Sequence, residues 1–261
     1  MNQSKNIKLT IAYEGTNYAG WQRQKNKKTI QGLIEDTIRN LTREHELKLY
    51  AAGRTDAGVH ALGQVANFKT RSAIPVDRWL MILNNLLPPD IKIKNTEEVD
   101  NKFNARYRAR SRIYRYFIMN DPGKSASYYT RKAFLSKYCY FLETPLDLEI
   151  MKKVAKYLLG IHDFSAFSCL NNQKKDSLAK SRVRNIKRIN IIKKGPLIIF
   201  SMEADGFLYK MARLIVGTLI IFSIEKREPE KILQILENKD SQKSGSVVPP
   251  NGLYLVKVKY K

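Results

Sequence analysis

Hydrophobic positions along the chain repeat with two different periods, which predicts strands mixed with helices. Ile7, Leu9 and Ile11 alternate with polar or small residues, so residues 7–13 are expected to form a half-buried strand. After Thr29 the apolar residues recur at three-and-four spacing, the pattern of one helix face, and the Thr29 side chain is suited to cap that helix. The chain therefore opens with a strand followed by an amphipathic helix.

The same mixture continues through both halves of the chain. Further strands are expected at residues 48–52, 64–69, 91–94, 112–119, 183–192, 197–202 and 253–260, and further helices at 75–87, 147–159 and 207–224. Short turns join many of these elements, which favours an α+β fold with a largely antiparallel sheet. At 261 residues the chain has room for two modules. We place an N-terminal α+β domain at residues 1–105 and a C-terminal α+β domain at 106–261.

The charge balance points to a polyanionic partner. Lys and Arg number 47 against 24 Asp and Glu, which gives a formal net charge of +23. Cations that neutralise phosphates release condensed counterions and so gain affinity for any nucleic acid. A lysine-rich genome that raises the Lys content of every protein is the alternative explanation, and composition alone leaves both open.

Cysteine, histidine and leader signals narrow the class of protein further. Cys139 and Cys169 stand without a pairing motif, as is typical of a reducing compartment, and the three histidines are scattered, so no metal site is expected. The N-terminus lacks the apolar core of a signal peptide. The longest apolar stretch, at 214–222, is far shorter than the roughly 20 residues that span a bilayer. We therefore expect a soluble, cytoplasmic protein with no membrane association.

The segment GRTDAGVH at 53–60 forms a loop between two expected strands and is the densest in chemistry. Its glycine spacing imitates the first part of a phosphate-binding loop. That motif, however, requires Lys followed by Ser or Thr where this chain has Val59 and His60. A nucleoside triphosphate site is therefore disfavoured.

Asp56 is the candidate catalytic group of this loop. The small neighbours Ala57 and Gly58 would let another molecule approach its carboxylate closely, and Arg54 would favour the ionised form. An ionised, accessible carboxylate suits a nucleophile or a proton-abstracting base. The alternative is an Asp that only hydrogen-bonds the backbone amides of its own turn, and the spacing leaves both open.

A row of arginines precedes two tyrosines in the segment ARYRARSRIYRYFIMN at 105–120. The evenly spaced residues, which would share one face of an extended strand, are Arg106, Arg108, Arg110, Arg112, Tyr114 and Tyr116. Guanidinium groups on phosphates beside a ring that stacks on a base are the ingredients of RNA recognition. A basic edge strand with its tyrosines packed inward is equally compatible with the pattern. A second basic stretch, expected to bind phosphate at the surface, comprises Lys174, Lys175, Lys180, Arg182, Arg184, Lys187 and Arg188.

The apolar helix expected at 207–224 carries Lys210 and Arg213 near its start. A buried charge is costly unless it is paired, so a buried Arg213 would need a carboxylate, and Asp56 is a candidate. An arginine that extends to the surface along the helix is the alternative.

Together, GRTDAGVHALGQV at 53–65 and YEGTNYAGWQRQ at 13–24 resemble the tRNA pseudouridine synthase A (TruA) family. Further similar segments are FNARYRARSRIYRY at 103–116, HDFSAF at 162–167, DGFLYKMARLIVGTL at 205–219 and GLYLVKVKY at 252–260. The resemblance thus covers essentially the whole chain.

The resemblance implies a pseudouridine synthase fold, with two α+β halves, a mainly antiparallel sheet and a basic cleft between the halves. It implies an isomerase that converts uridines 38, 39 and 40 in the anticodon stem-loop of tRNA to pseudouridine. It also implies a homodimer that needs neither a metal nor an organic cofactor.

Site residues follow from the resemblance position by position. Asp56 matches the catalytic aspartate, expected to act as a nucleophile, and Arg54 the arginine before it. Tyr114 matches the active-site tyrosine of the pattern that Arg112 opens. Arg213 matches the arginine that pairs with the catalytic carboxylate. Ala212 and Leu214 depart from the Val and Asn often found beside that arginine, which puts the helix packing in doubt but not the chemistry.

Three alternatives stay open at this point. The sequence does not decide whether Asp56 attacks the sugar, adds to the base or abstracts a proton. A non-catalytic RNA-binding protein would share the charge and the aromatic residues, but it gives no reason for an acid in a basic loop. An enzyme of the same chemistry that acts on another RNA fits all of the motifs.

Overall fold

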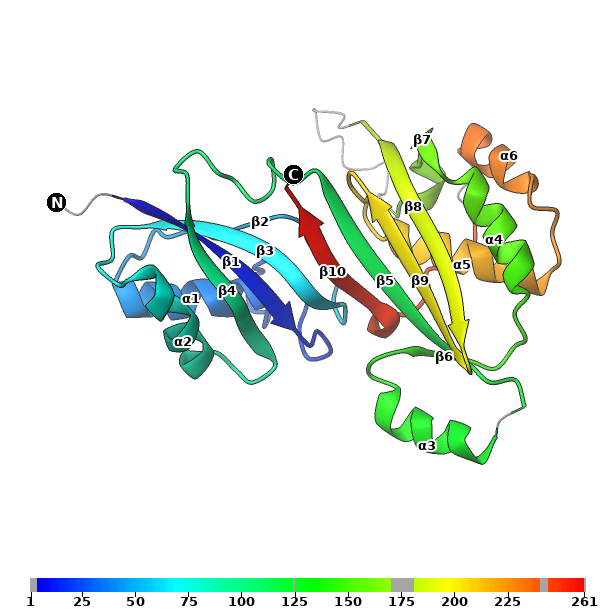
Figure 1. The fold of residues 1–261 in the computed structure, drawn as a ribbon, viewed down its shortest axis with the longest axis horizontal. Helices are drawn as coiled ribbons and strands as arrows, with labels where there is room; N and C mark the ends of the chain where they lie inside the picture. The colour runs from blue at the N-terminus through cyan, green and yellow to red at the C-terminus, as the bar shows by residue number, and fades with distance from the viewer. Residues whose placement is uncertain (1–3, 124, 170–180, 240–243, 261) are drawn as a thin grey trace. The chain divides into compact units, whose positions relative to one another are not determined.

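The computed structural model describes residues 4–123, 125–169, 181–239 and 244–260, and the chain divides into two compact units (Figure 1). Unit 1 comprises Met1–Arg110 and Tyr254–Lys261, and unit 2 comprises Ser111–Leu253. The C-terminal segment therefore clusters with the first unit, and the division into domains at residues 1–105 and 106–261 stays a prediction. Unit 2 is thus inserted between the first and last parts of unit 1.

Unit 1 is a sheet with two helices packed beside each other (Figure 1). Its strands are β1 (Lys5–Tyr13), β2 (Tyr50–Ala51), β3 (His60–Thr70), β4 (Ile91–Val99) and β10 (Leu253–Lys259), and its helices are α1 (Ile30–Thr42) and α2 (Val76–Leu86). The strand order is β4-β1-β3-β10, with β2 beside β3. β1 runs antiparallel to β3 and β4, and β10 runs parallel to β3.

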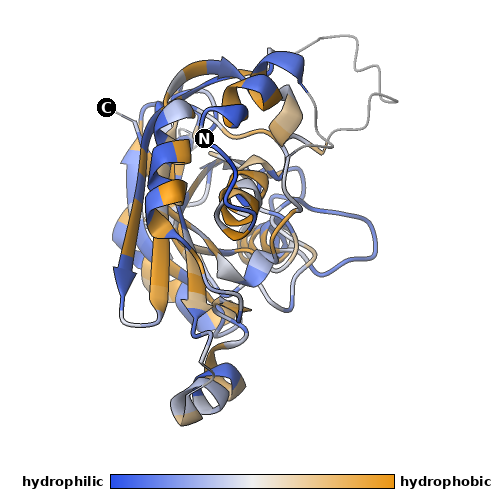
Figure 2. Ribbon diagram, turned by 90° about the vertical axis from the view of Figure 1, so that its right-hand side faces the viewer, coloured by the Kyte–Doolittle hydropathy of each residue, from blue (hydrophilic) through white to orange (hydrophobic). Residues whose placement is uncertain are grey.

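The hydrophobic pattern explains these elements. Ile7, Leu9 and Ile11 are fully buried on one face of β1, as their alternation predicts. Thr29 caps α1 because its Oγ1 accepts a hydrogen bond from the Gly32 amide at 3.3 Å. Figure 2 shows the resulting bands of hydrophobic and hydrophilic residues on the same strands and helices.

Unit 2 also combines strands with helices. Its strands are β5 (Ser111–Asn120), β6 (Tyr140–Leu142), β7 (Gly160–Asp163), β8 (Val183–Lys194) and β9 (Leu197–Ala204). Its helices are α3 (Ala126–Leu135), α4 (Leu148–Tyr157), α5 (Met211–Ile224) and α6 (Lys231–Asn238), with short 3-10 turns at Ser165–Phe167 and Pro250–Gly252. The strand order is β5-β9-β8-β7 with antiparallel pairs, and β6 runs parallel beside β5. The α+β class with a mainly antiparallel sheet is confirmed.

Helix α5 begins later than the apolar pattern predicts. Lys210 adopts a left-handed backbone conformation with φ 60°, so residues 207–210 precede the helix instead of forming its first turn. A Cβ on Gly217 would lie 1.9 Å from the Ser246 carbonyl oxygen, and one on Gly245 would lie 2.4 Å from the Gly217 oxygen. The backbone around residue 245 therefore packs directly on the backbone of α5.

The extended arginine row is corrected by the structure. The strand begins at Ser111, and residues 105–107 form a turn instead. The Asn104 side chain accepts hydrogen bonds from the amides of Arg106 at 2.9 Å and Tyr107 at 3.3 Å, which bends the backbone locally. Only Arg112, Tyr114 and Tyr116 share a face of β5.

The sequence pattern does not predict helices α3 and α6. In α3 only Tyr128 is buried, so the helix has no apolar stripe to detect, and Figure 1 shows it apart from α4, α5 and α6. In α6 the buried residues are Ile232, Ile235 and Leu236, a stripe too short to stand out. Within the described ranges no helix combines the length and apolar character needed to cross a bilayer. Of the second basic stretch, Lys174, Lys175 and Lys180 lie outside the described residues.

Candidate active site

Asp56 lies in unit 1 on the loop that joins β2 to β3, as the sequence predicts. Exposure varies along this loop. Thr55 and Val59 are buried, Arg54 is exposed and Asp56 is intermediate. The Val59 amide donates to the Asp56 carbonyl oxygen at 3.2 Å and closes a turn through Gly58, whose φ is 76°. The loop thus anchors its neighbours in the core and keeps Asp56 partly accessible.

The segment at 13–24, which we call the strap, packs against the backbone of the Asp56 loop. The Trp21 amide donates to the Thr55 carbonyl oxygen at 3.1 Å, and the hydroxyl groups of Tyr13 and Thr55 are hydrogen-bonded at 2.8 Å. Gly20 has a φ of 91°, and a Cβ on it would lie 2.7 Å from the Thr55 oxygen and 3.0 Å from the Asp56 carbonyl carbon. The two most specific sequence motifs therefore meet backbone to backbone.

Helix α1 in turn holds the strap. Arg23 Nε donates to Glu35 Oε2 at 2.7 Å, and a second Arg23 nitrogen reaches Asp36 at 2.6 Å. Glu35 is only 3% exposed, and its other oxygen accepts hydrogen bonds from the Leu49 amide at 3.0 Å and the Gln31 side chain at 2.9 Å. Because this buried carboxylate is fully engaged, it stabilises the end of the strap instead of costing stability.

Unit 2 carries the remaining residues that the sequence singled out. Tyr114 on β5 is 7% exposed, and its ring meets Phe207 edge to face with centroids 4.9 Å apart. Arg112 on the same face donates to the Asp205 carbonyl oxygen at 2.6 Å. Tyr116, two residues further on, is fully buried, and burial raises the pKa of its hydroxyl well above its usual range.

Arg213 is buried on α5, at 9% exposure, so its side chain does not extend to the surface. Its Nε donates to the Val248 carbonyl oxygen at 2.7 Å. The close backbone contact of Gly217 with Ser246 brings residue 248 to the helix and makes this hydrogen bond possible. The ion pair of Arg213 with Asp56 stays a prediction.

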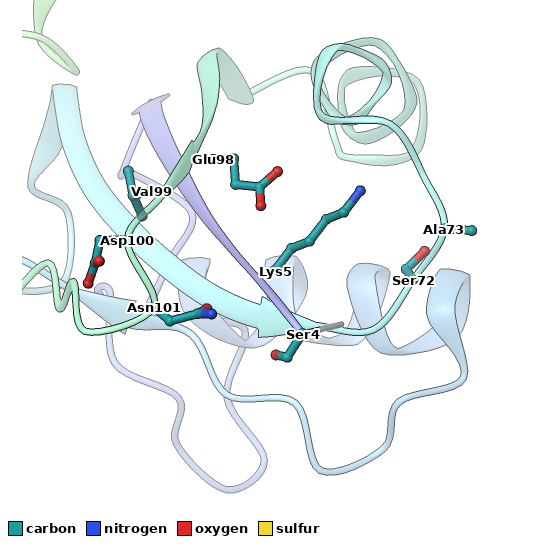
Figure 3. A pocket seen from close by; sticks show the side chains of 8 residues that line it. All are labelled: Ser4, Lys5, Ser72, Ala73, Glu98, Val99, Asp100 and Asn101. Atoms are coloured by element: carbon teal, nitrogen blue, oxygen red, sulfur yellow. The ribbon is translucent and has the colours of Figure 1, made fainter. Parts of the chain in front are cut away.

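The cavity of unit 1 lies away from the Asp56 loop. A cavity of about 620 Å³ is lined by Ser4, Lys5, Ser72, Ala73, Glu98, Val99, Asp100 and Asn101 (Figure 3). It lies where Lys5 pairs with Thr70, at the end of β1 opposite to Tyr13, which is roughly 25 Å away along an extended strand. No cluster of His, Cys, Asp and Glu suited to a metal occurs among the described residues. Burial raises the pKa of the Cys139 thiol to about 11, so it is no nucleophile at neutral pH.

Comparison with known proteins decides the family. The family model described as tRNA pseudouridine synthase matches residues 9–108 and 154–261. The chain belongs to the tRNA pseudouridine synthase family. The predicted resemblance and enzyme class are thereby confirmed, and the protein is an isomerase that acts on tRNA.

Three relatives show the extent of the similarity. The tRNA pseudouridine synthase A of Acetivibrio thermocellus is 46% identical over 256 residues, which cover 98% of this chain and 100% of the relative. That of Caldicellulosiruptor saccharolyticus is 44% identical with the same coverage. That of Clostridium kluyveri is 43% identical over 257 residues, again 98% of this chain and 100% of the relative.

Sequence reasoning about this synthase missed the residues that hold the Asp56 loop. Tyr13, Gly20 and Trp21 belong to the motif at 13–24, but the sequence alone does not assign them a structural role. The signal available was the pair of glycines at 15 and 20 in a short segment rich in aromatic residues. Glycine at such a position marks a close backbone approach, but its partner comes from a loop 35 positions further along, and only the fold identifies it.

We predict that Gly20→Ala lowers kcat of the synthase by about 10- to 100-fold while its Kd for tRNA changes by no more than a few fold. The added methyl group meets Thr55 and Asp56 backbone atoms at 2.7 and 3.0 Å and must displace the loop. Pseudouridine formation under saturating tRNA measures kcat, and filter binding measures Kd. Gly53→Ala is the matched control, since its methyl group meets no atom within 4 Å. A Gly20→Ala enzyme with wild-type kcat would show that the strap does not position the loop.

Proposed function

We propose that this synthase isomerises uridines 38, 39 and 40 in the anticodon stem-loop of tRNAs, as a cytoplasmic homodimer without a metal or organic cofactor. The observation that carries the proposal is the partly accessible Asp56 on a loop held by the strap, within the motif GRTDAGVH. The relatives named tRNA pseudouridine synthase A share 41–46% of their residues with the chain. The net charge of +23 suits a substrate covered in phosphates.

We assign the nucleophile to the Asp56 carboxylate. The target nucleotide has to leave its stack to reach Asp56, at a cost of ~a few kcal/mol that phosphate contacts offset. As the nucleophile, the carboxylate bonds to the sugar C1′ while the bond between C1′ and uracil N1 breaks. The freed uracil rotates, and C5 then bonds to C1′ and displaces the carboxylate. C5 loses its proton and N1 gains one, so atoms balance and no oxidant or external energy is needed. A carboxylate on a loop whose backbone is fixed by its neighbours suits this step.

Tyr114, Arg112, Arg54 and Arg213 are proposed to bind the substrate around Asp56. The edge contact with Phe207 fixes the Tyr114 ring, which suits packing against an extruded base. Arg112 and Arg54 supply cations for phosphates. Arg213, which is buried on α5, is proposed to pair with the Asp56 carboxylate, as the family resemblance implies. If Tyr114→Phe leaves kcat unchanged, the ring of Tyr114 but not its hydroxyl takes part in the mechanism.

We expect Asp56→Asn to abolish product while leaving tRNA affinity within a few fold. The amide keeps the shape of the side chain but is a poor nucleophile. Release of tritium from C5-labelled uridine in tRNA reports each turnover, because C5 gives up its hydrogen when it bonds to the sugar. Asp77→Asn, at an exposed carboxylate on α2 of the same unit, is the matched control. Turnover by Asp56→Asn would refute the assignment, and binding without turnover by the wild type would favour a non-catalytic RNA chaperone.

The modified positions are expected to be lost together when the gene is deleted. Mapping of pseudouridine in RNA from a deletion strain should show loss at positions 38, 39 and 40 of tRNAs, with other positions unchanged. In vitro, tRNAs that carry uridine at one of these three positions should each be substrates. Loss at other positions, or in another class of RNA, would replace the proposed target and leave the chemistry intact.

A homodimer is expected in solution at micromolar concentration. Sedimentation equilibrium should give a mass about twice that of one 30.2 kDa chain, and added tRNA should shift the complex without dissociating it. A mass of one chain over the whole concentration range would contradict the dimer but not the enzymatic assignment.

A further inference from the structure

His60 is a buried polar residue to which the proposed reaction gives no role. It ends the motif GRTDAGVH and begins β3, and it is 1% exposed. The Gly15 amide donates a hydrogen bond to its Nδ1 at 3.0 Å. That nitrogen accepts through its lone pair, so the neutral ring carries its proton on Nε2.

The surroundings hold the ring in one orientation. The Tyr254 ring stacks on it with centroids 4.6 Å apart and planes inclined by 22°. Glu14 Oε1 lies 3.6 Å from Nδ1, which is too far for a hydrogen bond. On the other side Gly15 is pressed against Val59, since a Cβ on Gly15 would lie 2.0 Å from the Val59 carbonyl oxygen. The amide of Gly15 is thus directed at Nδ1 by contacts that allow little movement.

The hydrogen bond joins the two segments whose contact positions Asp56. The backbone of His60 continues the Asp56 loop directly, and Val59 closes the turn on the Asp56 carbonyl oxygen. The side chain of His60 holds Gly15, whose carbonyl oxygen accepts from the Tyr18 amide at 3.1 Å within the strap. Gly20, further along the strap, presses on the backbone of Thr55 and Asp56. A change at Nδ1 therefore reaches Asp56 through the strap.

We infer that His60 is a positioning residue for Asp56, acting by accepting the Gly15 amide proton at Nδ1. The inference rests on the proposed catalytic role of Asp56. His60 is not itself a proton carrier for the substrate, because its ring is buried under Tyr254 and its Nδ1 is occupied by the Gly15 amide. The described residues around it also offer no cluster that could hold a metal.

Two amide variants isolate the position of the acceptor. In His60→Asn the side-chain oxygen is bonded to Cγ, as Nδ1 is in histidine, so it can accept from Gly15. In His60→Gln the oxygen is one bond further out and overshoots. Both variants lose the stack on Tyr254, so this loss cancels in the comparison. We expect His60→Asn to keep kcat within a few fold of the wild type and His60→Gln to lower it by about 10- to 100-fold, with KM for tRNA unchanged in both.

Amide hydrogen exchange at Gly15 supplies a readout that a general loss of stability would not give. In protein labelled with ¹⁵N-glycine, the Gly15 amide should be protected in the wild type and in His60→Asn, and exposed in His60→Gln. Equal kcat for the two variants, or a kcat loss without a difference in Gly15 protection, would overturn the inference. If neither variant folds, rapid exchange of Gly15 in the wild type would overturn it instead.

The same experiment separates this inference from the proposed function. An active Asp56→Asn enzyme removes the catalytic assignment, whatever His60 does. An inactive Asp56→Asn enzyme together with a fully active His60→Gln enzyme leaves the assignment in place and removes the positioning role alone.

Discussion

The contact between the strap and the Asp56 loop is the constraint on which the site depends. It is made between backbones, because glycines at 15 and 20 leave no side chain between the two segments. Backbone hydrogen bonds and one pair of hydroxyl groups, those of Tyr13 and Thr55, then fix their register. On a free loop the Asp56 carboxylate, our proposed nucleophile, would sample many positions, and main-chain contacts that fix the loop restrict them before substrate binds.

The carboxylates of Glu35 and Asp56 differ in burial, and this difference matches the different roles we assign to them. Glu35 is buried and accepts hydrogen bonds from Arg23, Gln31 and a backbone amide, so its carboxylate holds α1 against the strap. Asp56 is less buried, on a loop where Arg54 is exposed. In a chain of net charge +23 a negative group repels phosphate. An acid in such a loop is consistent with our proposal that the carboxylate contacts the nucleoside while the surrounding cations contact the phosphates of the RNA.

Much of unit 1 could be predicted from the sequence because its signals are local. The alternation at Ile7, Leu9 and Ile11 and the cap at Thr29 depend only on near neighbours. The start of α5 could not, because a left-handed Lys210 interrupts an apolar run that continues on both sides. The arginine row failed since Asn104 bends the backbone before the strand begins. The site was predicted as residue types, but the partners of Gly15, Gly20 and Arg213 lie far away in sequence and required the fold.

The return of the chain to unit 1 sets an order of assembly during translation. β10 pairs with β3 at His60 and Ala61, and Tyr254 covers the His60 ring. These residues leave the ribosome only after all of unit 2 has been made. Until then β10 does not pair with His60 and Ala61, and the Tyr254 ring does not stack on the imidazole. A nascent chain thus carries the motif GRTDAGVH early but gains the contacts of β10 with His60 only after unit 2 has been made, so completion of this region waits for the second unit.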